Sequence, residues 1–262
     1  MVQKKNKQKP VVLSIAGYDP SSGAGITADV KTIAAHGCYG VTCITALTVQ
    51  STRGVLSVEP VEGRIISETL EQLANDVDLA AIKIGMLGSG EAAKAVAAFL
   101  KRHWLRLVVL DPVLTSSSGA DLISKEGVKV LKERILPQAC AVTPNIAEAA
   151  ALTGLNVTNM EEVQAAAQSL RDLGVRNIII TGGHLDPPHD FVLLEDGRTA
   201  TLEGERILTR STHGTGCAFS TALACNLALG KSPLESAKNA KRFVETALKN
   251  APVIGKGVGP VL

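Results

Sequence analysis

Residues 210–224, RSTHGTGCAFSTALA, place Gly214 and Gly216 directly before an apolar run of helical period. The first turn of a helix leaves backbone N–H groups unpaired, and with the helix dipole these groups attract anions. Glycine lets an anionic group approach the backbone with no Cβ in the way. The GTGC sequence, with Thr215 between the glycines and Cys217 after them, therefore predicts a phosphate cradle. The alternative is an ordinary glycine-rich helix start capped by a threonine side chain.

Two carboxylates follow runs that are predicted to be strands. Asp111 ends the run LRLVVLD, and Glu148 lies three residues after Asn145 in TPNIAEAAAL. A magnesium ion that bridges nucleotide phosphates requires oxygen ligands of this kind, directly or through water. Each carboxylate also has a structural alternative, because Asp111 before Pro112 is a common turn and Asn145 with Glu148 can form a capping box. Their occurrence together with an anion cradle favours function.

Two common nucleotide-binding motifs are absent or incomplete. No Gly-x-x-x-x-Gly-Lys-Ser/Thr sequence occurs, which excludes a P-loop NTPase as far as a motif can exclude it. The sequence GAGITA at 23–28 matches a dinucleotide fingerprint, but the first strand ends near Ala16 and residues 43–45 supply no acid for a ribose. A nicotinamide dehydrogenase is therefore rejected. We interpret the long loop GYDPSSGAG at 17–25 as a substrate-side loop, because it follows the first strand.

The elements that must position these residues form an alternating pattern. Short β-rich apolar runs alternate with longer segments of helical period, which is typical of an α/β layered fold around a mainly parallel sheet. Strands are predicted at 11–16, 40–50, 79–85, 105–111, 139–143 and 176–181. Helices are predicted near 25–36, 62–75, 90–102, 124–134, 146–153, 160–173, 215–229 and 232–249. Asp196-Gly197, between two alternating runs, predicts a hairpin at one sheet edge.

Composition points to one large domain. The chain has 262 residues, 45% of them hydrophobic, and we predict a disordered basic leader at 1–10 and a single domain at 11–262. The formal charge of +2 comes from four leader lysines, without which 23 basic residues face 25 acidic ones. This balance, with 3% aromatic residues, excludes the basic face and stacking platforms of a nucleic-acid-binding protein. No run approaches the ~20 apolar residues of a membrane span.

The number and spacing of the cysteines bear on the redox state of the compartment in which the protein is found. There are five of them, an odd number, and they form no Cys-x-x-Cys pair. This pattern favours reduced thiols over a disulfide framework or a structural zinc site, so we predict a cytoplasmic protein.

At this point the motifs show a resemblance. The segments SIAGYDPSSGAGITADVKT, ITALTVQST, IKIGMLGS, VVLDPVL, VTPNIAEAAAL, GGHL and STHGTGCAFSTALA occur in the order and spacing of the hydroxymethylpyrimidine and phosphomethylpyrimidine kinases of thiamine biosynthesis. The resemblance runs from about Val11 to Leu248. It implies a ribokinase-like three-layer α/β/α sandwich and a homodimer. It also implies ATP- and Mg²⁺-dependent phosphorylation of 4-amino-5-hydroxymethyl-2-methylpyrimidine, then of its monophosphate.

The same resemblance implies roles for particular residues. Gln50 would bind the pyrimidine, and Cys217 would face its hydroxymethyl group. The other implied residues line the pyrimidine pocket (Gly17, Met86, Val113), bind the nucleotide (Asn145, Thr181, Gly183) or hold the metal (Asp111, Glu148). The cradle residues Gly214, Thr215 and Gly216 would stabilise the migrating phosphoryl group.

The chemistry of two residues agrees with these roles. A carboxamide can meet a ring nitrogen and an adjacent amino group at once, as glutamine does with adenine, so Gln50 suits an aminopyrimidine. Its alternative is a polar strand terminus. Cys217 stands where much of the superfamily has aspartate, and a helix N-terminus could lower its pKa from ~8.5. It would then orient or deprotonate the substrate hydroxyl, or else only shape the pocket.

Two departures from the family pattern remove cations. Thr181 stands where many relatives carry lysine before Gly-Gly-His, and the loop TSSSGAD at 115–121 lacks another lysine. Magnesium and backbone amides would then have to neutralise the phosphate charge that these lysines neutralise in the relatives. Two alternatives stay open: a pyridoxal kinase of the same superfamily, which Gln50 argues against, and a nucleotide- or pyrimidine-binding module without catalysis.

Other polar residues receive structural interpretations. Lys83, inside an apolar run, is expected to pair with a carboxylate such as Asp111. His184, His189 and His213 show no metal-ligand spacing and are interpreted as solvated loop residues.

Overall fold

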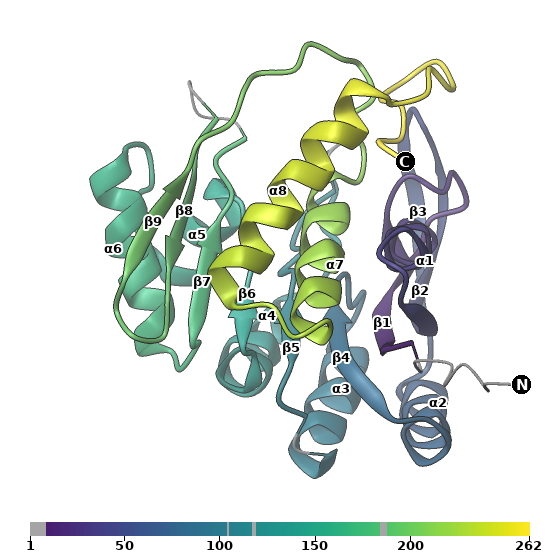
Figure 1. Cartoon of the computed structure of the whole chain (residues 1–262). Coiled ribbons are helices and arrows are strands. Elements are labelled where there is room, and N and C mark those ends of the chain that lie inside the picture. The colour runs from purple at the N-terminus through teal and green to yellow at the C-terminus, as the bar shows by residue number, and fades with distance from the viewer. Residues whose placement is uncertain (1–8, 104, 117–118, 184–187) are drawn as a thin grey trace, which may run out of the picture.

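The computed structural model describes residues 9–103, 105–116, 119–183 and 188–262, so residues 1–8 of the predicted leader lie outside the described part. The described residues form one nine-stranded sheet in the order β3-β2-β1-β4-β5-β6-β7-β8-β9 (Figure 1). The strands are β1 (Val11–Tyr18), β2 (Tyr39–Ser51), β3 (Gly54–Pro60), β4 (Leu79–Ile84), β5 (Val108–Leu110), β6 (Ala141–Val142), β7 (Asn177–Ile180), β8 (Asp190–Leu193) and β9 (Thr199–Leu202).

The centre of the sheet is parallel, as predicted. Strands β2, β1, β4, β5, β6 and β7 pair in parallel, while β3 and the β8–β9 hairpin pair antiparallel at the two edges. Gly197 lies in the turn of that hairpin with a φ of 86°, which confirms the predicted Asp196-Gly197 turn. Strand β3 was not predicted, because this edge strand has little burial pattern and leaves Leu56 85% exposed.

All eight predicted helices are present among the described residues. They are α1 (Gly25–Ala35), α2 (Gly63–Asp76), α3 (Gly90–His103), α4 (Lys125–Val130), α5 (Ile146–Thr153), α6 (Met160–Asp172), α7 (Thr215–Ala228) and α8 (Pro233–Lys249). The predicted helix at 124–134 continues beyond α4 as a π-helical turn (Leu131–Ile135) and a 3₁₀ turn (Leu136–Gln138).

Helices cover both faces of the sheet and make it the middle of three layers. One hydrophobic core joins strand residues such as Leu13 and Ile82 to helices α2 to α6. The other joins their strand neighbours, such as Val12 and Ala81, to α1, α7 and α8. Because alternate strand residues point to opposite faces, each parallel strand feeds both cores. Figure 1 shows α7 and α8 side by side in front of the sheet.

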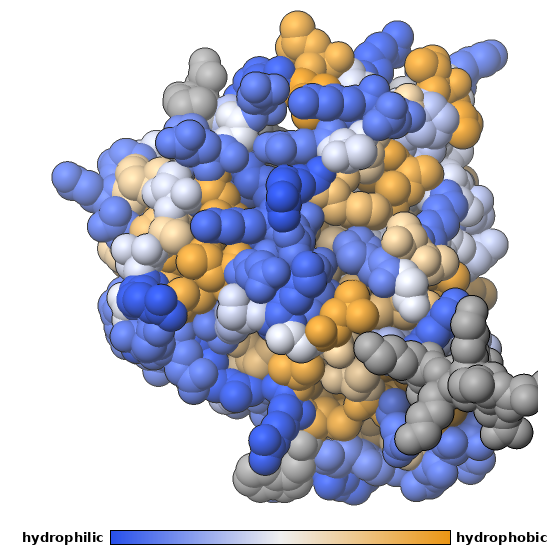
Figure 2. All heavy atoms as spheres, viewed as in Figure 1, coloured by the Kyte–Doolittle hydropathy of each residue, from blue (hydrophilic) through white to orange (hydrophobic). Residues whose placement is uncertain are grey.

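The arrangement gathers the candidate residues at one edge. The parallel strands end near the top of the view in Figure 1, where α7 begins. Figure 2 shows apolar residues at the top of the same face, over the loop before α7 and the C-terminal segment, where Leu208, Val253 and Ile254 are exposed. Within the described residues, no helix has the length and apolar character needed to cross a membrane.

Candidate active site

The start of α7 is open to a ligand in the way the GTGC sequence predicts. Gly214 is the N-cap residue with a φ of 86°, so the N-cap position supplies no side chain to accept a hydrogen bond from the first turn. The first turn also holds no acidic residue. A Cβ built on Gly216 would meet no atom within 4 Å. The alternative of a threonine side-chain cap is therefore wrong, because the N-cap residue is Gly214. Thr215 N donates to the Thr212 carbonyl oxygen at 3.4 Å, which leaves the N–H groups of Gly216 and Cys217 for a ligand.

Steric contact with the loop at 17–25 also restricts position 214 to glycine. A Cβ on this residue would clash with the carbonyl oxygen of Gly23, and a Cβ on Gly23 would clash with the ring of His213. The loop at 17–25 therefore packs directly against the start of α7. This contact supports its interpretation as a loop at the ligand site.

Asp111 lies beneath α7 at the end of β5. Its side chain is nearly buried, and the Ser220 hydroxyl of α7 donates a hydrogen bond of 3.0 Å to Asp111 Oδ2. Lys83 Nζ lies 3.9 Å from the same oxygen but only 3.0 Å from both carboxylate oxygens of Asp29. The main partner of Lys83 is therefore Asp29 of α1, not Asp111 as expected. No sequence pattern connected these two residues, because 54 positions separate them.

Glu148 is the second acidic residue of the site. Asn145 Oδ1 accepts from Glu148 N at 2.9 Å, and Glu148 Oε2 accepts from Asn145 N at 2.9 Å, so the capping-box alternative is observed. Burial, with a contribution from Asp111, raises the pKa of Glu148 to about 8. Burial also raises the pKa of Asp111, although Lys83 opposes the shift. Two crowded carboxylates of this kind suit a divalent cation, which would stabilise their charged forms.

Cys217 lies in the first turn of α7 and keeps part of its surface exposed. Burial of the thiol nevertheless raises its pKa to about 12, and the nearby Lys83 only partly opposes this shift. The direction is opposite to the one expected from the helix N-terminus. The thiol is therefore neutral at physiological pH, and the thiolate base considered from the sequence is not supported.

The predicted pyrimidine pocket comes together at the ends of β1, β2 and β4. A Cβ on Gly17 would lie 2.9 Å from Met86 Sδ, so the two residues are neighbours. Met86 belongs to a small apolar cluster with Ala46 of β2, and Val113 packs against this cluster. Gln50 lies further along β2 than Ala46, next to the last residue of the strand, and is half-buried. The structure therefore brings Gly17, Met86 and Val113 together.

The predicted nucleotide residues lie at the ends of β6 and β7. Asn145 and Thr181 form an isolated parallel bridge, in which Thr181 N donates to the Pro144 carbonyl oxygen at 2.9 Å. Gly183 is exposed, with no atom within 4 Å of a built Cβ. Asn145 is the N-cap residue of α5, and the strands β6 and β7 that precede these residues lie on the opposite side of β5 from β2, which carries Gln50.

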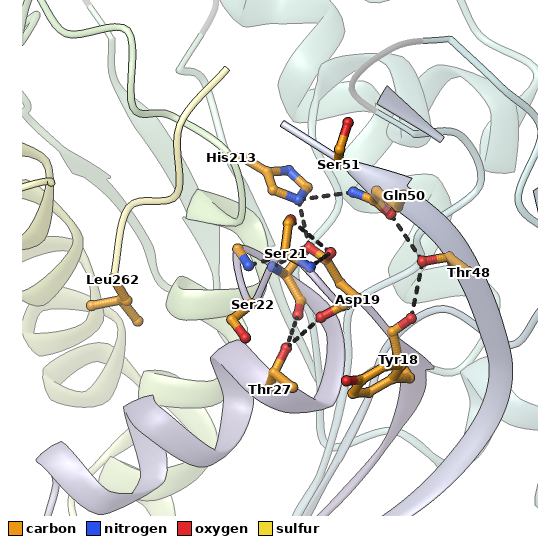
Figure 3. A network of polar contacts seen from close by, with 12 residues as sticks. Tyr18, Asp19, Ser21, Ser22, Thr27, Thr48, Gln50, Ser51, His213 and Leu262 are labelled. Carbon is orange, nitrogen blue, oxygen red and sulfur yellow. Dashed lines mark hydrogen bonds and ion pairs between the residues drawn. The ribbon is translucent and has the colours of Figure 1, made fainter. Parts of the chain in front are cut away.

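A polar network connects Gln50 to the start of α7 (Figure 3). His213 Nε2 lies 3.0 Å from Gln50 Nε2 and 2.8 Å from Asp19 Oδ2. The His213 side chain is only 12% exposed, so its interpretation as a solvated residue is wrong. His189 is half-buried, with its Nδ1 atom buried, so only part of its side chain contacts solvent. His184 lies outside the described residues.

The comparisons with known proteins agree with this geometry. The family model described as "Phosphomethylpyrimidine kinase" matches residues 19–262. The chain belongs to the phosphomethylpyrimidine kinase family. It is 44% identical over 255 residues to a hydroxymethylpyrimidine/phosphomethylpyrimidine kinase of Haemophilus influenzae, covering 95% of this chain and 94% of that protein. It is 43% identical over 251 residues to the thiamine biosynthesis bifunctional protein ThiED of Geobacter sulfurreducens, covering 95% of this chain and 51% of that protein.

A solved structure places the family among related kinases. The crystal structure of an ADP complex of Bacillus subtilis pyridoxal kinase matches with a TM-score of 0.88 at 31% identity, covering 97% of this chain and 96% of that chain. The predicted family, the ribokinase-like α/β fold and the kinase activity are thus confirmed, together with phosphorylation in thiamine biosynthesis. Membership of a kinase family makes this chain a phosphotransferase, and ADP in the relative supports ATP as the co-substrate.

Three residues of the site in this family member were missed from the sequence. Asp19 and Asp29 attracted no attention because each is a single acid in a loop or helix, and Ser220 was one hydroxyl in an apolar helix. The position of Asp19 at the end of the first strand was the one available signal. Nothing in the sequence indicated the other two.

Proposed function

We propose that this kinase transfers the γ-phosphoryl group of ATP to the hydroxymethyl group of 4-amino-5-hydroxymethyl-2-methylpyrimidine, and then to its monophosphate. The observation that carries the proposal is the uncapped start of α7, which lies above Asp111 and beside the loop that contacts the pyrimidine pocket. Phosphoryl transfer requires alignment and charge stabilisation more than covalent catalysis. An open helix N-terminus, a buried carboxylate and an apolar pocket supply these requirements.

Asp111 and Glu148 would hold the magnesium ion. Both are buried oxygen donors, and both have pKa values raised by burial, which a bound divalent cation would reverse. Magnesium supplies charge neutralisation on the nucleotide phosphates when it is bound. The residues of the chain orient the reactants: Asn145, Thr181 and Gly183 lie where they would border the nucleotide, and Gln50 would fix the pyrimidine.

We expect the two cradle glycines to respond differently to alanine. Gly214→Ala should lower the free energy of unfolding by at least about 2 kcal/mol, because it combines a left-handed backbone with a clash against Gly23. Gly216→Ala should change stability by less than about 1 kcal/mol, because its Cβ meets open space. It should still raise the KM for ATP several-fold, since the methyl group occupies the cradle. Urea unfolding and steady-state kinetics check both results, and an unchanged KM in Gly216→Ala would contradict the cradle.

Cys217 would orient the substrate hydroxyl as a neutral thiol. The pKa of about 12 keeps the thiol protonated between pH 6 and 9. Cys217→Ser retains a donor of similar size, so we expect turnover within about tenfold of the wild type and the same pH profile. Cys217→Ala should lose more activity than Cys217→Ser. A rise of activity with pH that is present in the wild type and lost in both variants would show that the thiolate acts as a base.

The pyridoxal kinase of B. subtilis motivates a second candidate substrate, because its fold covers almost the whole chain. A direct experiment separates the two candidates. The protein is incubated with ATP, magnesium and either the pyrimidine alcohol or pyridoxal, and the products are followed by phosphorus NMR and mass spectrometry. We expect the pyrimidine monophosphate and then the diphosphate. Binding of the pyrimidine without any product would instead indicate the non-catalytic module.

The assembly and location of the enzyme are further proposals. A homodimer has a candidate surface on the β2–β3 edge, where Leu47, Val49 and Leu56 are exposed. Light scattering coupled to size-exclusion chromatography measures the mass. The cysteine pattern favours the cytoplasm.

A further inference from the structure

The carboxamide of Gln50 lies between two groups that already have other partners (Figure 3). Thr48 Oγ1 is 3.2 Å from Gln50 Oε1 and 3.0 Å from the carbonyl oxygen of Tyr18. His213 Nε2 is 3.0 Å from Gln50 Nε2 and 2.8 Å from Asp19 Oδ2. The orientation of the amide, with its oxygen toward Thr48 or toward His213, therefore depends on which of these two neighbours has a proton left to donate to it.

Asp19 determines the proton on His213. Its carboxylate is 3% exposed and accepts hydrogen bonds from Ser21 N at 2.8 Å, Ser21 Oγ at 2.7 Å, Gly23 N at 3.2 Å and Ala24 N at 2.9 Å. Burial opposes its charge, but the hydrogen bonds from His213 and Ser21 hold the pKa of Asp19 below its usual value. An ionised carboxylate only accepts hydrogen bonds. His213 Nε2 must therefore carry a proton and donate it, which leaves no lone pair there for the Gln50 amide.

Tyr18 determines the proton on Thr48 by the same reasoning. A threonine hydroxyl has one proton, and a backbone carbonyl only accepts. The Thr48 proton goes to the Tyr18 oxygen, so Thr48 Oγ1 is left as an acceptor for Gln50. The amide thus needs its N–H₂ at the Thr48 end and its oxygen at the His213 end. A half-turn about the Cγ–Cδ bond exchanges these two atoms of similar size. The Gln50 N–H₂ then donates to Thr48 Oγ1, and the Gln50 oxygen shares the Nε2 proton of His213 with Asp19.

We propose that His213 and Thr48 lock the Gln50 carboxamide with its oxygen toward His213, and that this lock decides which way round the aminopyrimidine binds. The direction of binding rests on the proposed function. The free edge of the amide then offers an oxygen at the His213 end and an N–H at the Thr48 end. The amino group of the pyrimidine lies at the former and its ring nitrogen at the latter.

This direction places the alcohol where the chemistry needs it. In 4-amino-5-hydroxymethyl-2-methylpyrimidine, the hydroxymethyl group is next to the amino-bearing carbon, on the side away from the ring nitrogen. It therefore extends past the His213 end, where the chain continues into Gly214 and α7. The reversed amide would turn the ring over and carry the alcohol away from the cradle. His213 is a positioning residue that acts through Gln50.

The test compares two ligands that differ in the hydrogen-bonding groups that face the Gln50 carboxamide. The 4-oxo analogue presents a carbonyl and a ring N–H in place of the amino group and ring nitrogen. We expect the wild type to prefer the amino form by about 10- to 100-fold in kcat/KM. His213→Phe leaves the amide free to turn, so the preference should fall below about threefold and the KM for the amino form should rise about tenfold. His213→Gln, which can donate an N–H, should restore part of the preference.

Two controls separate positioning from folding. His103→Phe removes a histidine–carboxylate contact of 2.9 Å to Glu71 on another face, and it should keep the wild-type preference. If His213→Phe lowers kcat/KM equally for both ligands and leaves their ratio unchanged, His213 only supports the loop and the proposal is overturned. If the wild type phosphorylates neither ligand, the proposed function is wrong.

A measurement on the free protein tests the lock without any substrate. Nitrogen-15 NMR should show His213 protonated at Nε2, and nuclear Overhauser contacts should connect the Gln50 side-chain N–H₂ to Thr48. Contacts from that N–H₂ to His213 instead, with an unprotonated Nε2 atom, would overturn the proposal whatever the substrate proves to be.

Discussion

Asp111→Asn is expected to lower kcat about a thousandfold, which corresponds to about 4 kcal/mol of transition-state stabilisation. The substitution keeps the shape of the side chain and the acceptor for the Ser220 hydroxyl, but it removes the charge that would bind magnesium. Raising the magnesium concentration should not restore activity. Steady-state kinetics across a magnesium titration measure both effects.

The fold of Asp111→Asn should be retained. Burial raises the pKa of Asp111, so the folded protein disfavours the charged carboxylate, and a neutral amide removes that cost. The midpoint of thermal unfolding should therefore stay within a few degrees of the wild type. Asp76→Asn makes the same chemical change at an exposed helix end and should keep full activity. Activity above a tenth of the wild type in Asp111→Asn would contradict a metal-binding role.

The sequence predicted the parallel sheet and its helices because both depend on local periodicity. The strands that contain Leu13 and Ile82 and the helices between them bury apolar residues at regular spacing. This hydrophobic periodicity can be recognised in the sequence without knowledge of tertiary contacts. The edge strand β3 lacks such a pattern, and only its pairing with β2 defines it. The apolar residues of the proposed pyrimidine pocket, Gly17, Met86 and Val113, were predicted from the resemblance alone.

What the sequence could not supply is pairing between distant polar residues. His213 and Asp19 are 194 positions apart, and a histidine in a glycine-rich loop is usually solvated. Their contact exists because two glycines, Gly23 and Gly214, let the backbones approach. The raised pKa of Cys217 has a similar origin, since local sequence shows a helix N-terminus and not the burial around the thiol. Site chemistry therefore depended on packing that only the folded chain shows.

Lys83→Met and Asp29→Asn are each expected to lower the free energy of unfolding by about 3–5 kcal/mol. Both side chains are fully buried, and Asp29 also accepts hydrogen bonds from Thr221 at 2.7 Å and Ser14 at 2.5 Å. Burial alone would lower the pKa of Lys83, but the neighbouring acidic groups, of which Asp29 contributes most, together raise it. Each single variant therefore leaves a buried charge without its main partner.

The double variant Lys83→Met/Asp29→Asn should lose clearly less stability than the two single losses added together, because neither charge is then left alone. An exposed pair provides the contrast: Lys94 and Glu126, 2.6 Å apart, should give losses below about 1 kcal/mol in the same series. Urea unfolding followed by circular dichroism measures both cycles. Additive losses at Lys83 and Asp29 would show that the pair is not coupled. Since Asp29 of α1 also accepts a hydrogen bond from Thr221 of α7, this buried charge pair connects the helix that carries the proposed phosphate cradle to Lys83 of β4.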